Sequence, residues 1–273
     1  HGKVRFTLNH IATPSDCSLY RTGIAVGDYP VDHHHKRYTG EEELPDLHFF
    51  PIPSFTVPLG VMIPENVDNL IVAEKSISVS NIANGTTRLQ PVVMQIGQAA
   101  GALASMMLTD GTGVSVREVQ KALLEAGCYL QPFIDVKPDS PLFPAVQRIG
   151  STGILRGEGR QIQWTNVTNL HVNELFERRD LKDLYGYYGI EYQEYEGCGP
   201  LSVADLVEML RAFPGYRDDV DWKAALNDAG HSCEDMEKQP VTRAMFAVLT
   251  DCILNPFEAF DVDVYGNVIR ESR

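Results

Sequence analysis

Cysteine is scarce in this sequence and is never arranged for metal binding. The five cysteines are far apart and no CxxC pair occurs, which argues against a zinc site and against a thioredoxin-like redox centre. Their odd number leaves at least one thiol unpaired, and scattered single cysteines are usually small buried apolar residues. We therefore predict no metal site. The cysteines are Cys17, Cys128, Cys198, Cys233 and Cys252.

Positive charge and long apolar runs are also lacking. Lysine and arginine together number 23 against 37 aspartates and glutamates, which gives a formal net charge of -14 at pH 7. This balance argues against nucleic acid or an anionic membrane as a partner. No apolar run approaches the length of a bilayer span, and no signal peptide stands at the start. We expect no nucleic-acid partner and no membrane span.

Two further absences concern the start of the chain. The sequence begins at His1 without a methionine, and it contains no GxGxxG. That motif forms the glycine-rich turn that holds a dinucleotide pyrophosphate, so the corresponding strand, turn and helix are not in this sequence. We expect the chain to be a C-terminal piece of a longer protein, and the missing signal peptide then does not identify the compartment.

The residues that are present indicate a globular protein with two domains. The composition is 44% hydrophobic and 22% charged, and 273 residues suffice for one large or two ordinary domains. The character of the sequence changes at TDGTG, residues 109–113, which is followed by an amphipathic helix from Ser115 to Ala126. We predict an α+β fold with domains at 1–110 and 111–273.

The first domain is organised around a strand that leads into a long helix. The apolar run at 69–73, NLIVA, predicts a core strand, and the polar residues at 74–90 predict turns. A buried helix is expected at 91–108, because Pro91 suits a first helical position and no breaker follows. Thr87 or Gln90 stands where a helix cap is expected.

One face of this helix carries almost no side chain. Gly97, Ala100, Gly101 and Ala104 recur at spacings of three and four, and each glycine costs about 0.5 to 1 kcal/mol relative to alanine. Two explanations remain open: tight packing against a neighbouring element, or close approach of a flat cofactor. The helix start offers unpaired N–H groups, and Arg88 precedes it, so an anionic or electron-rich group would bind there.

A longer run through this region carries a family resemblance. NLIVAEKSISVSNIANGTTRLQPVVMQIGQAAGALA resembles the C-terminal flavin-contacting segment of the FAD-dependent oxidoreductase family, including bacterial members often labelled xanthan lyase-like. The resemblance continues upstream through RTGIAVGDYPVDHHH and IPSFTVPLGVMIPENVDN. It implies a partial flavin domain of strands and one long buried helix, whose start lies against the isoalloxazine ring of FAD.

The resemblance assigns cofactor contacts to five residues. Arg88, Leu89 and Gln90 would contact the flavin, and Gly97 and Ala100 would allow close packing. The family usually has Gly-Asp or Gly-Arg after the strand, where this chain has Glu-Lys at 74–75. Because the pyrophosphate motif is also absent, we expect this chain alone to bind FAD weakly or not at all. FAD and oxidoreductase activity would belong to the full-length protein, with the missing part N-terminal to His1.

The segment VDHHHKRY supplies the catalytic candidates. In the resembling family this segment lies near the substrate side of the flavin, so Asp32, His33 and His35 are candidates for substrate contact or proton transfer. On an extended chain His33 and His35 point the same way. The alternative is an ordinary polar loop. A metal lacks a third ligand at a recognisable spacing.

The second domain has an internal pattern of capped helices. Segments beginning at Thr168, Ser202 and Thr242 have a cap residue and helical apolar spacing, and two follow a short helix that ends at glycine, at 144–157 and 221–233. This pattern resembles the S-layer homology module, by which some bacterial surface proteins hold cell-wall polysaccharide. The alternative is a helical domain that simply packs on the first domain or on another subunit.

Tyrosines cluster in the middle of the second domain. The run LKDLYGYYGIEYQEYEG predicts either a strand or hairpin with half-buried rings or a platform on which a sugar ring stacks. Near the C-terminus, FDVDVYGNVI predicts a hairpin with Tyr265, Gly266 and Asn267 at its turn.

Two functions of different classes follow from the sequence. The leading hypothesis is the C-terminal portion of an FAD-dependent oxidoreductase that acts on a small-molecule or carbohydrate substrate. The alternative is a carbohydrate-binding or cell-surface polysaccharide-associated module, which would place the protein at the cell surface or in the periplasm. A polysaccharide lyase or hydrolase is suggested only by the label given to family members, since no catalytic set is recognisable.

Overall fold

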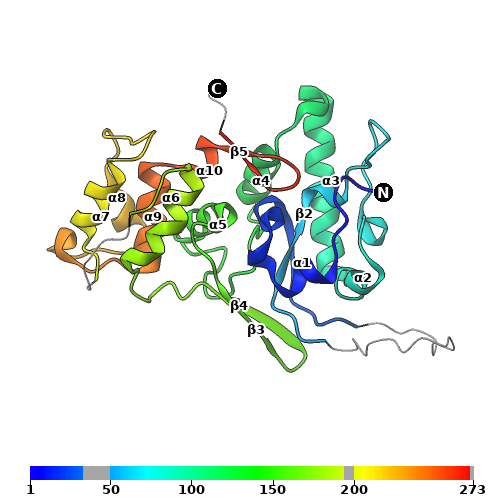
Figure 1. Cartoon of the computed structure of the whole chain (residues 1–273), viewed down its shortest axis with the longest axis horizontal. Helices are drawn as coiled ribbons and strands as arrows, with labels where there is room; N and C mark the ends of the chain where they lie inside the picture. The colour runs from blue at the N-terminus through cyan, green and yellow to red at the C-terminus, as the bar shows by residue number, and fades with distance from the viewer. Residues whose placement is uncertain (33–49, 194–199, 271–273) are drawn as a thin grey trace. The chain divides into compact units, whose positions relative to one another are not determined.

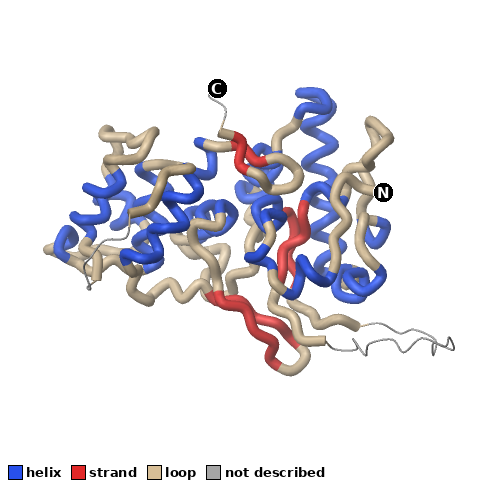
Figure 2. Tube along the Cα trace, in the orientation of Figure 1, coloured by secondary structure: helices blue, strands red, loops and turns tan. Residues whose placement is uncertain are grey.

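The computed structural model describes residues 1–32, 50–193 and 200–270. The protein has an α+β fold, as predicted, with more helix than strand. Figure 2 shows the helices together with three separate two-stranded sheets. The predicted residues His33 and His35 lie outside the described ranges.

The chain forms two compact units, each described below by itself. The first contains His1–Pro132, Gly159–Thr168 and Asp263–Asn267, and the second contains Phe133–Glu158, Asn169–Val262 and Val268–Arg273.

The first unit is built around a two-stranded sheet and one long helix (Figure 1). Strands β1 and β2 pair antiparallel with Ala25 opposite Val57. Its helices and strands are α1 (Leu8–Ala12), β1 (Gly23–Gly27), β2 (Phe55–Pro58), α2 (Asn81–Thr87), α3 (Gln90–Asp110) and α4 (Val116–Glu125), with most of the hairpin β3 (Glu158–Ile162) and β4 (Thr165–Asn169).

Strand β1 has β2 on one edge and glutamine side chains on the other. Gln95 of α3 accepts a hydrogen bond from the N–H of Val26 at 2.9 Å and donates one to its carbonyl at 3.1 Å. Gln120 of α4 is fully buried and donates to the carbonyl of Gly23 at 2.9 Å. A buried backbone group without a partner is costly, so these side chains take the place of a third strand.

The strand predicted at 69–73 is not formed. Asn69 lies in a turn at φ 55°, and residues 70–73 have no partner strand among the described residues. The backbone is held at Val72, whose N–H donates to the carbonyl of Met62 at 2.8 Å. Leu70 is 48% exposed. An apolar run predicts a strand only where a neighbouring strand is available, and the described part of the chain offers none here.

The turn region predicted at 74–90 contains a helix that sequence analysis missed. Ser80 caps α2 by accepting a hydrogen bond from the N–H of Ala83 at 3.2 Å. Thr86 is fully buried within this helix and donates its hydroxyl to the carbonyl of Tyr29. The polar residues that predicted turns therefore form hydrogen bonds inside a short helix.

Helix α3 forms as predicted, but only one side of it is buried. Val92, Ile96, Ala99 and Leu103 are buried at spacings of four, three and four. The opposite side is exposed, with Met94 exposed by 74%. The expectation of a buried helix therefore holds for one face only, which is the face that packs on the sheet.

The same helix meets the length and composition of a membrane span. The window Gln90–Thr109 has a mean hydropathy of 1.3 with 22% of it buried, whereas the sequence reading had found no run of sufficient length. Core helices of soluble proteins pass the same test, so length and composition alone do not identify α3 as a membrane span.

The second unit surrounds one buried helix. Nearly every residue of α9 is buried, and Phe246 on α9 stacks on Phe176 with ring centroids 3.8 Å apart. Helices α5, α7, α8 and α10 pack against α9. The elements are α5 (Phe143–Thr152), α6 (Leu181–Tyr188), α7 (Val203–Leu210), α8 (Trp222–Asp228), α9 (Arg243–Ile253), α10 (Pro256–Ala259), β5 (Asp261–Val262) and β6 (Val268–Ile269).

Two of the three predicted capped helices are confirmed. Ser202 and Thr242 accept hydrogen bonds from backbone N–H groups in the first turns of α7 and α9. The helix predicted from Thr168 is wrong, because Thr168 lies in strand β4 and the next α-helix begins at Leu181. The chain that follows β4 is instead held by Asp135, whose carboxylate accepts from the N–H groups of residues 170–172.

The first part of the tyrosine run, Leu181–Tyr188, forms helix α6 and belongs to a core, whereas residues 194–197 of the run lie outside the described residues. Tyr187 and Tyr188 of α6 are 3% and 6% exposed, and the ring of Tyr188 meets those of Phe213 and Phe260 edge to face. A strand is therefore not formed, and these two rings cannot stack on a sugar from solvent. The C-terminal hairpin is confirmed, with Gly266 at φ 81° in its turn.

Helix α1 begins with a hydrogen bond that requires a neutral histidine. The N–H of Thr7 donates to Nδ1 of His10 at 3.1 Å, and the ring of His10 stacks on Phe6. Burial lowers the pKa of His10 below its ordinary value of 6.5. Protonation of Nδ1 would remove the acceptor, so the folded state favours the neutral ring.

We expect His10 to make the folded state less stable as the pH falls. Between its lowered folded pKa and about 6.5, the unfolded chain binds a proton that the folded chain does not, so the free energy of unfolding decreases as pH decreases. His10→Gln keeps an acceptor for Thr7 but cannot be protonated. Urea unfolding at pH 7.5 and 5.5 should show a smaller loss for the variant. An equal loss in both proteins would contradict this account.

Gln95→Leu should destabilise the first unit by about 1 to 3 kcal/mol, because two backbone groups of Val26 lose their partner. Gln98→Leu is the matched control, since Gln98 lies on the exposed side of the same helix, and its effect should stay within about 0.5 kcal/mol. Urea denaturation measures both. Equal effects would show that the hydrogen bonds to β1 contribute little.

Candidate functional site

The predicted cofactor residues lie where α2 passes into α3. Arg88 is the C-cap residue that follows α2, and Leu89 is the N-cap residue that precedes α3. Gln90 is the first residue of α3. No side chain caps α3, so the expectation of a cap at Thr87 or Gln90 is wrong. The hydroxyl of Thr87 instead donates to the carbonyl of Ala83 at 3.1 Å. The first N–H groups of α3 therefore receive no side-chain acceptor.

Arg88 is held by Asp32, which brings a predicted cofactor residue beside a predicted catalytic residue. A guanidinium nitrogen, Nη2, donates to the carbonyl oxygen of Asp32 at 3.2 Å and lies 3.9 Å from a carboxylate oxygen of the same residue. The Asp32 side chain is 12% exposed and that of Arg88 is 34% exposed. The carboxylate offsets part of the arginine charge, so the two residues act as a pair.

The small-residue face of α3 has open space in front of it. A Cβ atom built on Gly97 or Gly101 would have no other atom within 4 Å. Ala100 is half-buried on the same helix, and Leu108 is 88% exposed near its end. Tight packing against another part of the described chain therefore does not explain these glycines.

Glu74, where the resembling family has glycine, has the backbone conformation that favours glycine. Its φ is 62°, in the left-handed region that residues with a Cβ atom rarely adopt. Its side chain is 60% exposed and lies 3.7 Å from the Nζ of Lys75.

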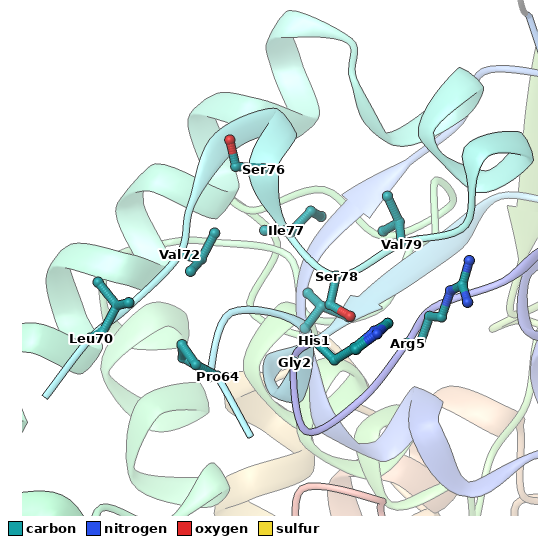
Figure 3. A pocket seen from close by; sticks show the side chains of 11 residues that line it. His1, Gly2, Arg5, Pro64, Leu70, Val72, Ser76, Ile77, Ser78 and Val79 are labelled. Atoms are coloured by element: carbon teal, nitrogen blue, oxygen red, sulfur yellow. The ribbon is translucent and has the colours of Figure 1, made fainter. Parts of the chain in front are cut away.

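A cavity of about 390 Å³ lies beside the segment at 69–73. Figure 3 shows Leu70 and Val72 on this segment, with Ser78 and Arg5 labelled on the neighbouring segments. The lining is mixed, since apolar side chains alternate with serines and one guanidinium group. Its residues are His1, Gly2, Arg5, Val61, Pro64, Leu70, Val72, Ser76, Ile77, Ser78 and Val79, and none of the predicted site residues is among them.

Sequence reasoning missed two features of this region. The pairing of Asp32 with Arg88 joins residues 56 positions apart, which no local pattern indicates. The cavity is formed by segments that meet only in the tertiary structure. Among the residues that the structure describes, no group of three or more His, Cys, Asp or Glu side chains could hold a metal ion.

Comparison with known proteins gives one result for the first unit. Residues 1–123 match the family model of the FAD dependent oxidoreductases. The match covers less than half of the 273 residues and includes β1, β2, the α2–α3 junction and most of α4. No curated protein and no solved structure matches the chain. The N-terminal part of the chain therefore carries an FAD oxidoreductase family domain, in part.

Glu74→Gly should raise the free energy of unfolding by up to about 1 kcal/mol. A residue with a Cβ atom costs roughly 1 to 2 kcal/mol in the left-handed conformation, and glycine removes this cost. Part of the gain is lost because glycine has more conformational freedom in the unfolded chain. Lys75→Gly is the control, because Lys75 has no positive φ, and it should lower stability. Urea denaturation measures the stability of both variants. A loss of stability in Glu74→Gly would contradict the inference that the backbone at Glu74 is strained.

Proposed function

We propose that the first unit is the flavin-facing part of an FAD-dependent oxidoreductase, and that FAD binds only when a polypeptide carrying GxGxxG completes the domain. The observation that carries this proposal is the family match over residues 1–123, which includes the uncapped start of α3 with Arg88 held beside it. In related proteins of this family the cofactor is FAD.

The residues present fit one end of the cofactor. The N–H groups at the start of α3 and the guanidinium of Arg88 are donors suited to the electron-rich pyrimidine end of the isoalloxazine ring. When bound, FAD would supply hydride transfer. Asp32 would orient Arg88 through the hydrogen bond that Arg88 donates to its carbonyl. No glycine-rich turn for the pyrophosphate exists in this sequence, so this chain fits the cofactor only in part.

Two exposed features support completion by further polypeptide. The segment at 69–73 is an apolar run without a neighbouring strand, and its backbone could add a strand to a sheet. The small-residue face of α3, with Met94 at one end and Leu108 at the other, is open along its length. We propose that the polypeptide N-terminal to His1 covers both. The exposed apolar surface in this unit would then be an interior surface.

The candidates for the substrate side of the flavin are the residues that the family resemblance indicated. Asp32 lies beside Arg88, and His33 and His35 follow it in the sequence. We propose these three as the residues that contact the substrate or transfer a proton, and a small molecule or a carbohydrate as the substrate.

A carbohydrate-associated role for the second unit is the second candidate. The segments that lead into its helices pair with one another, since Leu175 bridges Thr242 and Ser202 bridges Pro240. This convergence supports a repeat of the kind that resembles S-layer homology modules. The buried Tyr187 and Tyr188 remove the main argument for a sugar-stacking platform. The oxidoreductase proposal therefore stands first.

Flavin content tests the proposal. The purified 273-residue chain, mixed with FAD and passed through a desalting column, should retain no flavin absorbance. A longer polypeptide that adds a GxGxxG-bearing unit before His1 should retain FAD. In that longer protein, replacing Arg88 and Gln90 together by alanine should lower the retained flavin at least about tenfold, as the loss of one charge-assisted and one neutral hydrogen bond implies.

Arg179→Ala in the second unit is the control for charge and folding, because its side chain is 78% exposed and pairs with Glu177. It should leave the flavin content unchanged. Circular dichroism of all variants separates loss of binding from loss of fold. Tight flavin retention by the 273-residue chain, or unchanged retention after the double replacement, would refute the proposal.

A further inference from the structure

The hairpin of β3 and β4 presents a polar side to the first unit. Asn166 and Thr168 of β4 are 1% and 7% exposed, whereas Thr165 between the turn and Asn166 is exposed. Alternate residues of a strand point to the same side, so Asn166 and Thr168 face inward together. A strand that packs permanently on a core normally turns its apolar residues inward. This strand does the opposite.

In the part of the chain that the structure describes, four buried side-chain atoms of this region have no hydrogen-bond partner. The carboxamide oxygen and nitrogen of Asn166, the hydroxyl of Thr168 and the hydroxyl of Ser54 are all buried without a partner. Ser54 itself is 2% exposed and directly precedes β2. A buried polar group without a hydrogen bond opposes the arrangement that buries it, because water would satisfy that group.

These groups lie in one place at the end of the β1–β2 sheet. The N–H of Asn166 donates to the carbonyl of Asp28 at 2.7 Å. Gly27 pairs with Phe55 at this end of the sheet, and Asp28 and Ser54 are the residues next to this last pair along the two chains. A Cβ atom on Gly159 of β3 would lie 3.1 Å from the Thr168 hydroxyl and would collide with Pro53, so this part of the hairpin contacts the chain next to Ser54.

The other side of the hairpin faces solvent. Every residue of β3 except one half-buried glutamine is exposed, and Ile162 and Trp164 at the tip are exposed by 44% and 63%. Opening of the hairpin would therefore break few apolar contacts, and it would allow water to satisfy four polar atoms. The closed and open arrangements are for this reason close in free energy.

We propose that the β3–β4 hairpin is a movable cover over the end of the β1–β2 sheet, held closed weakly because its inner side is polar. The chain that it covers at Asp28 leads four residues later to Asp32, the partner of Arg88. Opening would admit a polar molecule to this end of the sheet. The inference stands on the hairpin alone and does not depend on the flavin proposal.

Amide hydrogen exchange of the full chain tests the movable cover. The N–H of Asn166 should exchange at least about tenfold faster than the N–H of Phe6, which is bonded to Ser78 at 2.9 Å in the core of the same unit. The exchange of Asn166 should be insensitive to low urea, because local opening exposes little surface. Exchange of both groups at one rate with one urea dependence would overturn the proposal.

Apolar replacements on the inner side should hold the cover closed. Asn166→Leu combined with Thr168→Val removes the unsatisfied atoms at nearly constant shape and should slow exchange at position 166 about tenfold, after correction for side-chain effects. Thr165→Val is the matched control, because it removes an exposed hydroxyl from the same strand, and it should change nothing. Faster exchange in the double variant would count against the proposal.

A thiol placed under the hairpin gives a second measurement if the double variant does not fold. Thr168→Cys puts a small group at a site that is 7% exposed. If the hairpin opens, a thiol reagent should modify the cysteine introduced at position 168, and the rate should not change with low concentrations of urea. Peptide mass identifies the modified position. Modification only as the whole unit unfolds would show that the hairpin is a fixed part of the structure.

Discussion

The first unit depends on the closure of the free edge of β1 by glutamine side chains. A two-stranded sheet leaves backbone groups unpaired on both outer edges, and in water such a sheet is marginally stable. Gln95 and Gln120 satisfy the edge of β1 from two different helices. These hydrogen bonds fix how α3 and α4 lie on the sheet, and the position of the α2–α3 junction follows from the position of α3. A sheet of two strands can therefore support a site.

The two sides of α3 have different roles because they face different surroundings. The side with Ile96 and Leu103 packs on the sheet and holds the helix in place. The opposite side, with Gly97 and Gly101, has open space within 4 Å. Glycines inside a helix are costly unless something approaches them closely. Under the proposed function, further polypeptide of the flavin domain would cover this open face. The second unit, by contrast, buries its central helix α9 on all sides and needs no such cover.

The sequence predicted elements well where the signal is local. The caps at Ser115, Ser202 and Thr242 and the glycine turn at Gly266 depend on residues within a few positions, and all four are formed. Predictions failed where a distant partner decides the conformation. The run at 69–73 lacks a neighbouring strand among the described residues and forms no strand, and Thr168 pairs within a hairpin instead of starting a helix.

By itself the sequence determined the long helix at α3, its glycine face, the absence of a pyrophosphate motif and the resemblance of residues 1–123 to the FAD dependent oxidoreductases, because each depends on residue types and short spacings. The tertiary structure alone decided that Arg88 pairs with Asp32, that the glycine face is open, and that Asn166 and Thr168 turn their polar side chains inward. Contacts between residues far apart in the chain depend on how elements pack, and no local pattern of side chains records that packing.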